Sequence, residues 1–268
     1  MQEIHLERLK WPDVEAYLKQ NDTVILPVGA TEQHGLHLPL GTDSLVAIEL
    51  ADQLGAKTNT LVAPPIWYGW SPHHLAYPGT ISLRPETLTE LIVDCSRSLI
   101  HHGFKKILII NGHRMANLPP IQIAATRVRN QTGALMVIAD PFYVGELAGR
   151  QIRTSEPGGV GHADELETSH MLHLLPELCD MSKAVKNMPA AKKYHVADPY
   201  VECDRVTAPS NIASYRARTA PSGVSGDPTV SSAEKGRLYN ELVLDNLYEV
   251  IEDMRATQVQ IYDNKPLF

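Results

Sequence analysis

The chain has 268 residues, of which 43% are hydrophobic and 21% charged, and its formal net charge is −7. This length is sufficient to bury one large core, so we expect a single domain over residues 1–268. The acidic balance, with lysines and arginines scattered along the chain, argues against the basic surface that nucleic-acid binding requires.

Cysteine usage and the start of the chain indicate the compartment. Cys95, Cys179 and Cys203 are far apart and form neither a disulfide framework nor a CxxC metal motif. The first residues lack the basic and apolar segments of a signal peptide, and no apolar run approaches the ~20 residues that cross a bilayer. We therefore expect a cytoplasmic protein.

Predicted strands and helices alternate in the first half of the chain. Short apolar runs predict strands, and segments with a 3.6-residue apolar period predict helices. In chain order the pattern predicts a helix at 9–18, a strand at 23–28, a helix at 44–54, a strand at 60–64, a helix at 85–102, a strand at 106–110, a helix at 119–131 and a strand at 134–139. This alternation predicts an α/β fold of three layers, with a mostly parallel sheet flanked by helices.

The second half of the chain is less regular. It predicts helices at 144–152, 164–174 and 232–254, with a hinge-like glycine loop at 158–161. Residues 186–230 are rich in Pro, Ser and Ala and have no strong period. We expect this segment to be irregular and to cover a site or form a subunit contact.

The loop after the first strand holds four ionisable side chains among glycines and apolar residues: Glu32, His34, His37 and Asp43. Open α/β sheets bind their ligands at the carboxyl ends of their strands. Glu32 and His34 point the same way in an extended chain, and Asp43 stands where a helix N-cap is expected. The setting predicts a metal site, with His37 as a supporting partner; a solvated surface loop is the alternative for a Glu-x-His pair alone.

A further histidine follows the strand predicted at 106–110, in the sequence Asn111-Gly112-His113. The carboxyl ends of parallel strands share one edge of a sheet, so His113 can approach the loop that holds Glu32 and Asp43. The alternative for a histidine after Asn-Gly is an ordinary turn residue.

The sequence Gly-Ala-Thr-Glu-Gln-His-Gly-Leu-His-Leu-Pro-Leu-Gly-Thr-Asp at 29–43 resembles the signature of the creatininase (creatinine amidohydrolase) family. Similar stretches extend from about residue 24 to 236, most of the chain. The resemblance implies a centre of two metal ions, with Glu32 and His113 on one ion, His34 on the other and Asp43 on both. It also implies a homo-oligomer, since the family commonly forms hexamers.

One position departs from creatininase itself, which carries a metal-binding Glu where this chain has Met115. A thioether is a poor ligand for hard divalent ions. The segment 161–169 resembles the family's Gly-His-Ala-Gly-Glu-x-Glu-Thr-Ser. If a helix begins at about His162, Glu165 lies one turn later on the same face. We therefore predict Glu165 as the remaining ligand of the second ion and expect Glu167 to cap backbone or form a salt bridge; a helix N-terminal acid is the alternative for Glu165.

Other residues are candidates for catalysis and substrate binding. His162 matches the family's catalytic histidine, and an imidazole titrates near neutral pH, so it can accept and deliver a proton. Ser71 and His74 lie in a loop with which the family lines its substrate pocket, although an ordinary turn also explains them. Arg114 stands where many members have glycine, and it either contacts a small-molecule substrate or lies on the surface.

The ligand types suit zinc, manganese or iron. Two such divalent ions sharing Asp43 hold a bridging hydroxide, so we expect a hydrolase that opens a small polar ring at a C–N bond, with His162 protonating the leaving atom. The resemblance leaves open C–C hydrolysis of an inositol-type cyclic diketone (3-dehydro-scyllo-inosose-like), and Met115 disfavours creatinine itself. A non-catalytic, metal-binding family member is the alternative from another class.

Overall fold

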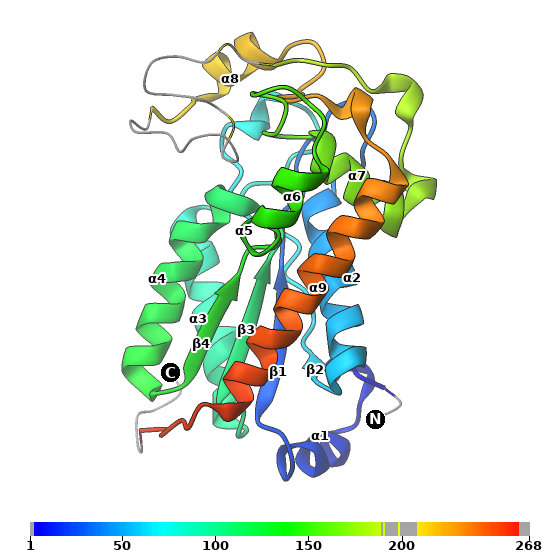
Figure 1. The fold of residues 1–268 in the computed structure, drawn as a ribbon. Helices are drawn as coiled ribbons and strands as arrows, with labels where there is room; N and C mark the ends of the chain where they lie inside the picture. Colours follow the sequence, from blue (N-terminus) through cyan, green and yellow to red (C-terminus); the bar gives the residue numbers. More distant parts are fainter. Residues whose placement is uncertain (1–2, 189, 191–197, 199–207, 263–268) are drawn as a thin grey trace.

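The computed structural model describes residues 3–188, 190, 198 and 208–262 (Figure 1). Its sheet has four parallel strands among these residues: β1 (Thr23–Val28), β2 (Leu61–Val62), β3 (Lys106–Asn111) and β4 (Leu135–Ala139). The strands lie in the order β2-β1-β3-β4, and β1 and β3 pair along their whole length. The predicted class, a three-layer α/β fold with a parallel sheet between helices, is confirmed.

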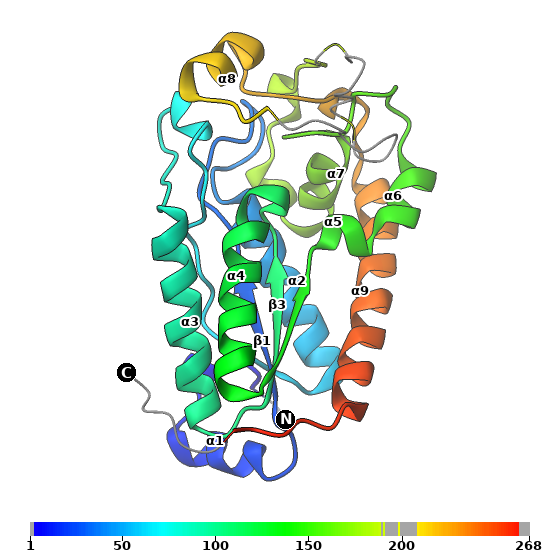
Figure 2. The same cartoon turned by 90° about the vertical axis from the view of Figure 1, so that its left-hand side faces the viewer.

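Helices cover both faces of the sheet (Figures 1 and 2). In the described part of the chain they are α1 (Trp11–Leu18), α2 (Thr42–Thr58), α3 (Pro85–His101), α4 (Arg114–Thr132), α5 (Pro141–Val144), α6 (Glu146–Ile152), α7 (Glu165–Leu174), α8 (Ile212–Thr219) and α9 (Ala233–Ala256). Short 3-10 turns are η1 (Leu6–Arg8), η2 (His74–Ala76), η3 (Pro176–Leu178), η4 (Met181–Lys183) and η5 (Pro228–Val230).

The core has two halves, one on each face of the sheet. Successive strand side chains point to opposite faces. Val24 and Leu26 of β1 therefore pack with α3 and α4, whereas Ile25 packs with α2 and α9. Every residue of β1 and β3 is buried, which explains why these strands appear as continuous apolar runs in the sequence.

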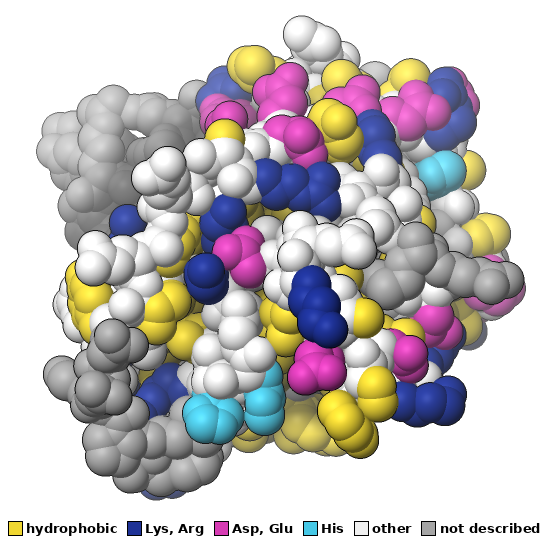
Figure 3. Space-filling model, turned by 90° about the horizontal axis from the view of Figure 1, so that it is seen from below, with side chains coloured by type: hydrophobic (Ala, Val, Ile, Leu, Met, Phe, Trp, Pro, Cys, Tyr) yellow, Lys and Arg dark blue, Asp and Glu magenta, His cyan; other side chains and the backbone are white. Residues whose placement is uncertain are grey.

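The carboxyl ends of the strands define the functional end of the molecule. At this end, the upper one in Figure 1, the loop after β1, η2, α7 and α8 gather. The opposite end carries α1, and its described surface mixes acidic and basic side chains without a continuous basic area (Figure 3). No helix within the described residues combines the length and apolar character needed to cross a membrane.

Two helices begin earlier than the sequence predicts. α2 begins at Thr42 with Gly41 as its N-cap, so Asp43 lies in the first turn and is not the cap residue. α4 begins at Arg114, although the prolines at 119 and 120 suggested a start there. The early start is anchored by Asn117, whose amide donates to the Gly29 carbonyl and accepts from the Trp70 N–H, both at 2.9 Å.

The less regular half of the chain also differs from expectation. The helix predicted at 144–152 corresponds to α6, which begins two residues later, and Gly145 separates it from the preceding short helix α5. The segment predicted as irregular, 186–230, contains α8 and η5. Within that segment, residues 189, 191–197 and 199–207 lie outside the described residues.

Candidate metal and catalytic site

Four predicted ligands converge at the carboxyl ends of β1 and β3. Glu32 and His34 lie in the loop after β1, Asp43 in the first turn of α2, and His113 directly after β3. His113 contacts both carboxylates, with Nδ1 3.0 Å from Asp43 Oδ2 and Nε2 3.3 Å from Glu32 Oε2. His34 Nε2 lies 3.1 Å from Asp43 Oδ1. All four residues are buried.

Several atoms of this cluster lack a hydrogen-bond partner among the described residues, namely Glu32 Oε2, His34 Nε2 and Asp43 Oδ2. Buried polar atoms are almost always hydrogen-bonded, and these three face other ligand atoms instead. Carboxylate oxygens and imidazole nitrogens are donors for divalent ions such as zinc and manganese. The residues present therefore fit a metal centre.

Burial and mutual charge shift the pKa values of the two carboxyl groups in opposite directions. Burial raises the pKa of Glu32 to about 7, against the lowering effect of His113. Burial acts in the same direction on Asp43, but the neighbouring His34 and His113 outweigh it and lower its pKa. Of the two carboxyl groups, Glu32 is therefore the one whose ionised form depends more on stabilisation by a nearby positive charge.

The two imidazoles are also perturbed. Burial acts to lower their pKa values, but the carboxylates outweigh it. Asp43 thus raises the pKa of His34 to about 10, and Glu32 with Asp43 raises that of His113 to about 9. In the ion-free protein, protonated His34 and His113 neutralise the carboxylate charges. Divalent cations can replace these protons and neutralise the same charges.

The structure does not bring the predicted ligand Glu165 to the cluster. Its carboxylate accepts from the backbone N–H groups of Thr154 and Ser155, each at 2.8 Å, and from Lys235 Nζ. The spacing argument assumed a helix from His162, but α7 begins only at Glu165, with Asp164 as its N-cap. Glu165 is therefore used to hold neighbouring segments together.

Glu167 is the glutamate of α7 whose carboxylate lies beside the cluster. One of its oxygens groups with ring nitrogens of His34 and His162, all within 4.8 Å of one another. Its Oε2 accepts from the Ala163 N–H at 2.6 Å, and its Oε1 lies 3.2 Å from Arg114 Nη2. The predicted backbone cap and salt bridge are both present, but the sequence argument missed that they place this carboxylate beside the cluster.

His162 lies over the cluster in a fixed orientation. Its Nε2 lies 2.7 Å from the Gln33 backbone carbonyl oxygen and 2.8 Å from the Gln33 side-chain amide nitrogen. Its Nδ1 faces Glu32 Oε1 at 3.6 Å. Burial holds the pKa of His162 well below 6.5. Backbone hydrogen bonds of 2.7 and 3.0 Å between His162 and Ser225 fix the residue from the other side.

Ser71 and His74 both contact the cluster. Ser71 Oγ lies 3.2 Å from His113 Nε2, and His74 Nε2 lies 3.4 Å from Glu32 Oε1. Both side chains are buried, so neither is an ordinary exposed turn residue. Their role toward substrate stays a prediction.

Two more residues at the site were not predicted. The Gln33 amide nitrogen lies 3.0 Å from His74 Nδ1 and 3.1 Å from the Tyr215 hydroxyl. The Tyr215 ring lies 4.8 Å from that of His74. Gln33 stood between two predicted ligands and could have been inferred. Tyr215 comes from α8, far along the chain, and nothing in the sequence marked it.

His37 and Arg114 connect the site to its surroundings. His37 Nε2 lies 2.9 Å from Thr168 Oγ1 of α7, as expected of a supporting residue. Arg114 was expected to contact substrate or lie on the surface. Its guanidinium instead donates to the Gly161 carbonyl and to Asp164, at 2.8 and 2.7 Å.

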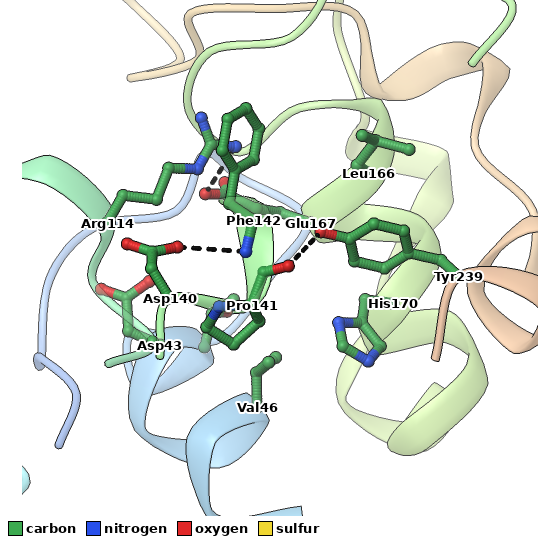
Figure 4. Close-up of a pocket in the computed structure, with 12 residues that line it drawn as sticks. Asp43, Val46, Arg114, Asp140, Pro141, Phe142, Leu166, Glu167, His170 and Tyr239 are labelled. Carbon is green, nitrogen blue, oxygen red and sulfur yellow. Dashed lines mark hydrogen bonds and ion pairs between the residues drawn. The ribbon is translucent and has the colours of Figure 1, made fainter. Parts of the chain in front are cut away.

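A small cavity of about 40 Å³ lies on the far side of Asp43 and Glu167 (Figure 4). Arg114, Asp140 and His170 contribute to its walls. Burial raises the pKa of Asp140 to about 6, against the lowering effect of Arg114. This volume is sufficient for water.

Comparison with known proteins agrees with this site. The model of the family described as "Creatininase: Creatinine amidohydrolase" matches residues 7–251. The chain belongs to the creatininase family. This finding confirms the family resemblance seen in the sequence.

Relatives in the family have different named activities. The chain is 31% identical to 3-dehydro-scyllo-inosose hydrolase of Thermotoga maritima, over 94% of this chain and 83% of the relative. It is 30% identical to creatinine amidohydrolase of Pseudomonas putida, over 93% of this chain and 96% of the relative. It is also 33% identical to the mycofactocin precursor peptide peptidase of Mycolicibacterium smegmatis, over 82% of this chain and 81% of the relative.

Solved creatininase structures share the fold. A mutant creatininase described as Zn-Zn type superposes with a TM-score of 0.79 at 26% identity, over 95% of this chain and 99% of that one. A manganese creatininase has a TM-score of 0.77 at 26% identity, over 95% of this chain and all of that one.

Proposed function

We propose that this protein is a dinuclear metal-dependent hydrolase that opens a small polar ring at a C–N bond, as in a cyclic amide. The observation that carries the proposal is the buried convergence of Glu32, Asp43 and His113 with unsatisfied ligand atoms. Membership of a hydrolase family supports hydrolysis as the reaction class.

We assign two sets of ligands that share Asp43, because its oxygens lie 3.1 Å from His34 Nε2 and 3.0 Å from His113 Nδ1. Glu32, Asp43 and His113 would hold one ion, and His34, Asp43 and Glu167 would hold the other. Zinc, manganese and iron all suit these donors, and the zinc and manganese forms of creatininase among the structural neighbours support the first two. Such a pair of ions, when bound, makes water nucleophilic at neutral pH and polarises a carbonyl group.

His162 is the proton carrier in this proposal. Both close contacts of its Nε2 are with Gln33, so Nδ1 is the ring nitrogen that would accept a proton from the attacking water. Because Nδ1 faces the ligand cluster, it can return that proton to the leaving nitrogen as the ring opens. Burial keeps the imidazole neutral, and therefore competent as a base, at pH 7.

Ser71, His74 and Tyr215 form the wall of the site on the side of His162. His74 and Tyr215 are linked through the Gln33 amide, so their positions are coupled. Ser71 is held by His113. We assign these side chains to orienting the polar groups of the substrate.

A second candidate function is C–C hydrolysis of a cyclic diketone of inositol type. Two observations favour it. Met115 is 62% exposed and cannot supply the carboxylate expected of creatininase, and one relative at 31% identity is an inosose hydrolase. The same base and the same ligands serve both reactions, because each begins with attack on a carbonyl carbon.

Elemental analysis and a substrate panel test the proposal together. About two zinc, manganese or iron ions per chain are expected, with turnover of a cyclic amide or formamidopyrimidine. Turnover restricted to keto-inositols selects the C–C reaction. A chain that binds ions but turns over none of these is the non-catalytic member, and a chain that binds no ion refutes the metal centre. Creatininase-level activity on creatinine would contradict our exclusion of that substrate.

Homo-oligomer formation, as a hexamer, and a cytoplasmic location remain part of the proposal. Several large apolar side chains near the functional end are at least 40% exposed, namely Leu36, Trp67, Tyr68, Leu75 and Ile81. Light scattering on purified protein measures the assembly directly, and a monomer at micromolar concentration would contradict it.

A further inference from the structure

Arg114 connects the segment that follows β3 to the segment that carries His162 and Glu167. It is the first residue of α4, adjacent to the ligand His113, and its backbone φ is +22°. Its guanidinium lies 3.9 Å from the centre of the Phe142 ring, which covers it on one side (Figure 4). An arginine in such a conformation, stacked on an aromatic ring, is held in place by its surroundings.

The guanidinium contacts three acceptors on one stretch of chain. Nη1 donates to the Gly161 carbonyl at 2.8 Å, and Nη2 donates to Asp164 Oδ2 at 2.7 Å. Nη2 also lies 3.2 Å from Glu167 Oε1. A planar fork of donors can serve several acceptors at once, which a lysine ammonium does less well.

These acceptors surround the turn that presents His162 and Glu167. Asp164 Oδ2 also accepts from the Gly161 N–H at 2.7 Å, while its Oδ1 accepts from the N–H groups of Leu166 and Glu167 at the start of α7. Ala163 within the turn has φ +51°. This φ lies in the left-handed region that non-glycine residues rarely adopt, so the turn depends on these bonds.

The position after Arg114 explains why such a link is needed. Met115 is exposed and offers no carboxylate, so the second ion must take its carboxylate from another element. Glu167 is the carboxylate that groups with His34. Within the described part of the chain, the Glu167 carboxylate contacts the Ala163 N–H and the Arg114 guanidinium, which hold its rotamer.

We propose that Arg114 is a positioning residue that fixes the Glu167 carboxylate as the ligand of the second metal ion. The inference rests on the proposed function and deepens it, because it assigns the carboxylate that replaces the one missing at position 115. Arg114 touches neither the metal nor the substrate in this arrangement; it acts through Glu167 and the 161–164 turn.

Metal titration of the ion-free protein tests this directly. Zinc or manganese is added to chelator-treated wild type and to Arg114→Met, and stoichiometry and affinity are measured by calorimetry and elemental analysis. The variant is expected to keep the first ion and to bind the second about 10- to 100-fold more weakly, as found when outer partners of metal ligands are removed. Unchanged affinity for both ions would overturn the inference.

Arg127→Met is a matched control. Arg127 lies on the same helix and pairs with Glu90 at the surface, with Nη1 to Oε1 at 2.6 Å. Both ions should bind this variant as in wild type. Arg114→Lys keeps the positive charge but lacks the planar guanidinium group, so we expect it to bind the second ion with intermediate affinity. If Arg114→Met fails to fold, Arg114→Lys takes its place in the test.

A double-mutant cycle with Glu167→Gln separates positioning from a general structural effect. If Arg114 acts through Glu167, removing both side chains weakens the second ion no more than removing Glu167 alone. Additive losses would mean that Arg114 acts by another route. If the wild-type protein binds no ions, the proposed function itself is contradicted. If the wild-type protein and the Arg114→Met variant both bind two ions with equal affinity, only the inference about Arg114 is contradicted.

Discussion

His113 Nδ1 lies 3.0 Å from Asp43 Oδ2, and this contact joins the turn after β3 to the first turn of α2. The two backbones approach closely at Gly112. A Cβ atom at this glycine would lie 2.0 Å from the Asp43 carbonyl oxygen. The candidate metal centre therefore requires a residue without a side chain beside His113.

Replacing Gly112 with Ala should damage the site. The added methyl group would push Asp43 away from His113 and cost about 1–3 kcal/mol of unfolding free energy. Urea denaturation and metal content measure the two effects. Gly41→Ala is the control, because a Cβ there first meets Trp67 at an ordinary 3.4 Å. Equal behaviour of the two variants would contradict the close approach.

Substitution of two glutamates of α7 should affect the metal content differently. Glu167→Gln removes a ligand oxygen and should lower the content from about two ions per chain to about one. Glu165→Gln should leave the metal content unchanged but lower stability, because Glu165 pairs with Lys235. Elemental analysis of both isosteric variants decides the assignment, and loss of an ion in Glu165→Gln alone would reverse it.

His162→Asn should reduce turnover without loss of metal. Removing a positioned acid-base group typically lowers kcat by about 10²- to 10⁴-fold. We expect unchanged metal content, because the other candidate ligands remain in place. Steady-state kinetics on the first substrate found in the panel give the measurement. Loss of an ion together with activity would instead make His162 a ligand.

His170 should make the protein less stable at low pH. It is buried against Asn240, with Nε2 2.9 Å from Oδ1, and burial lowers its pKa to about 4, against an ordinary value of 6.5. As the pH falls, His170 is therefore protonated in the unfolded chain at a higher pH than in the folded protein. The contribution of neutral His170 to the free energy of unfolding is complete above pH 6.5. It decreases by about 3 kcal/mol as the pH falls from 6.5 to 4.

The measurement compares wild type with His170→Gln. Urea denaturation of both proteins, after chelation of metal, gives their difference in unfolding free energy at pH 7.5 and at pH 5. Wild type should lose part of its advantage at the lower pH. A difference that does not change with pH would mean that His170 is not held neutral.

The sequence predicted the sheet and the ligands that sit on it. β1 and β3 are buried on both faces, so they appear as apolar runs, and the loops that follow them lie at one edge of a parallel sheet. Glu32, His34, Asp43 and His113 could therefore be placed near one another from the chain alone.

Glu167, the proposed carboxylate of the second ion, could not be placed in the same way. Its position depends on a turn whose Ala163 has φ +51°, held by Arg114 and by backbone pairing with Ser225. Local periodicity carries no information about such long-range bonds, so counting helical positions from His162 selected Glu165 in place of Glu167. Tyr215 was missed for the same reason, since only the path of the distant chain brings α8 to the site.

The backbone pairing of His162 with Ser225 has a consequence for redesign of the site. The proposed ligands Glu32, Asp43 and His113 lie next to the central strands, whereas His162 lies outside the sheet and is held by a residue that is distant in the sequence. A substitution at Ser225 is therefore expected to move the proposed proton carrier and to leave the proposed ligands in place.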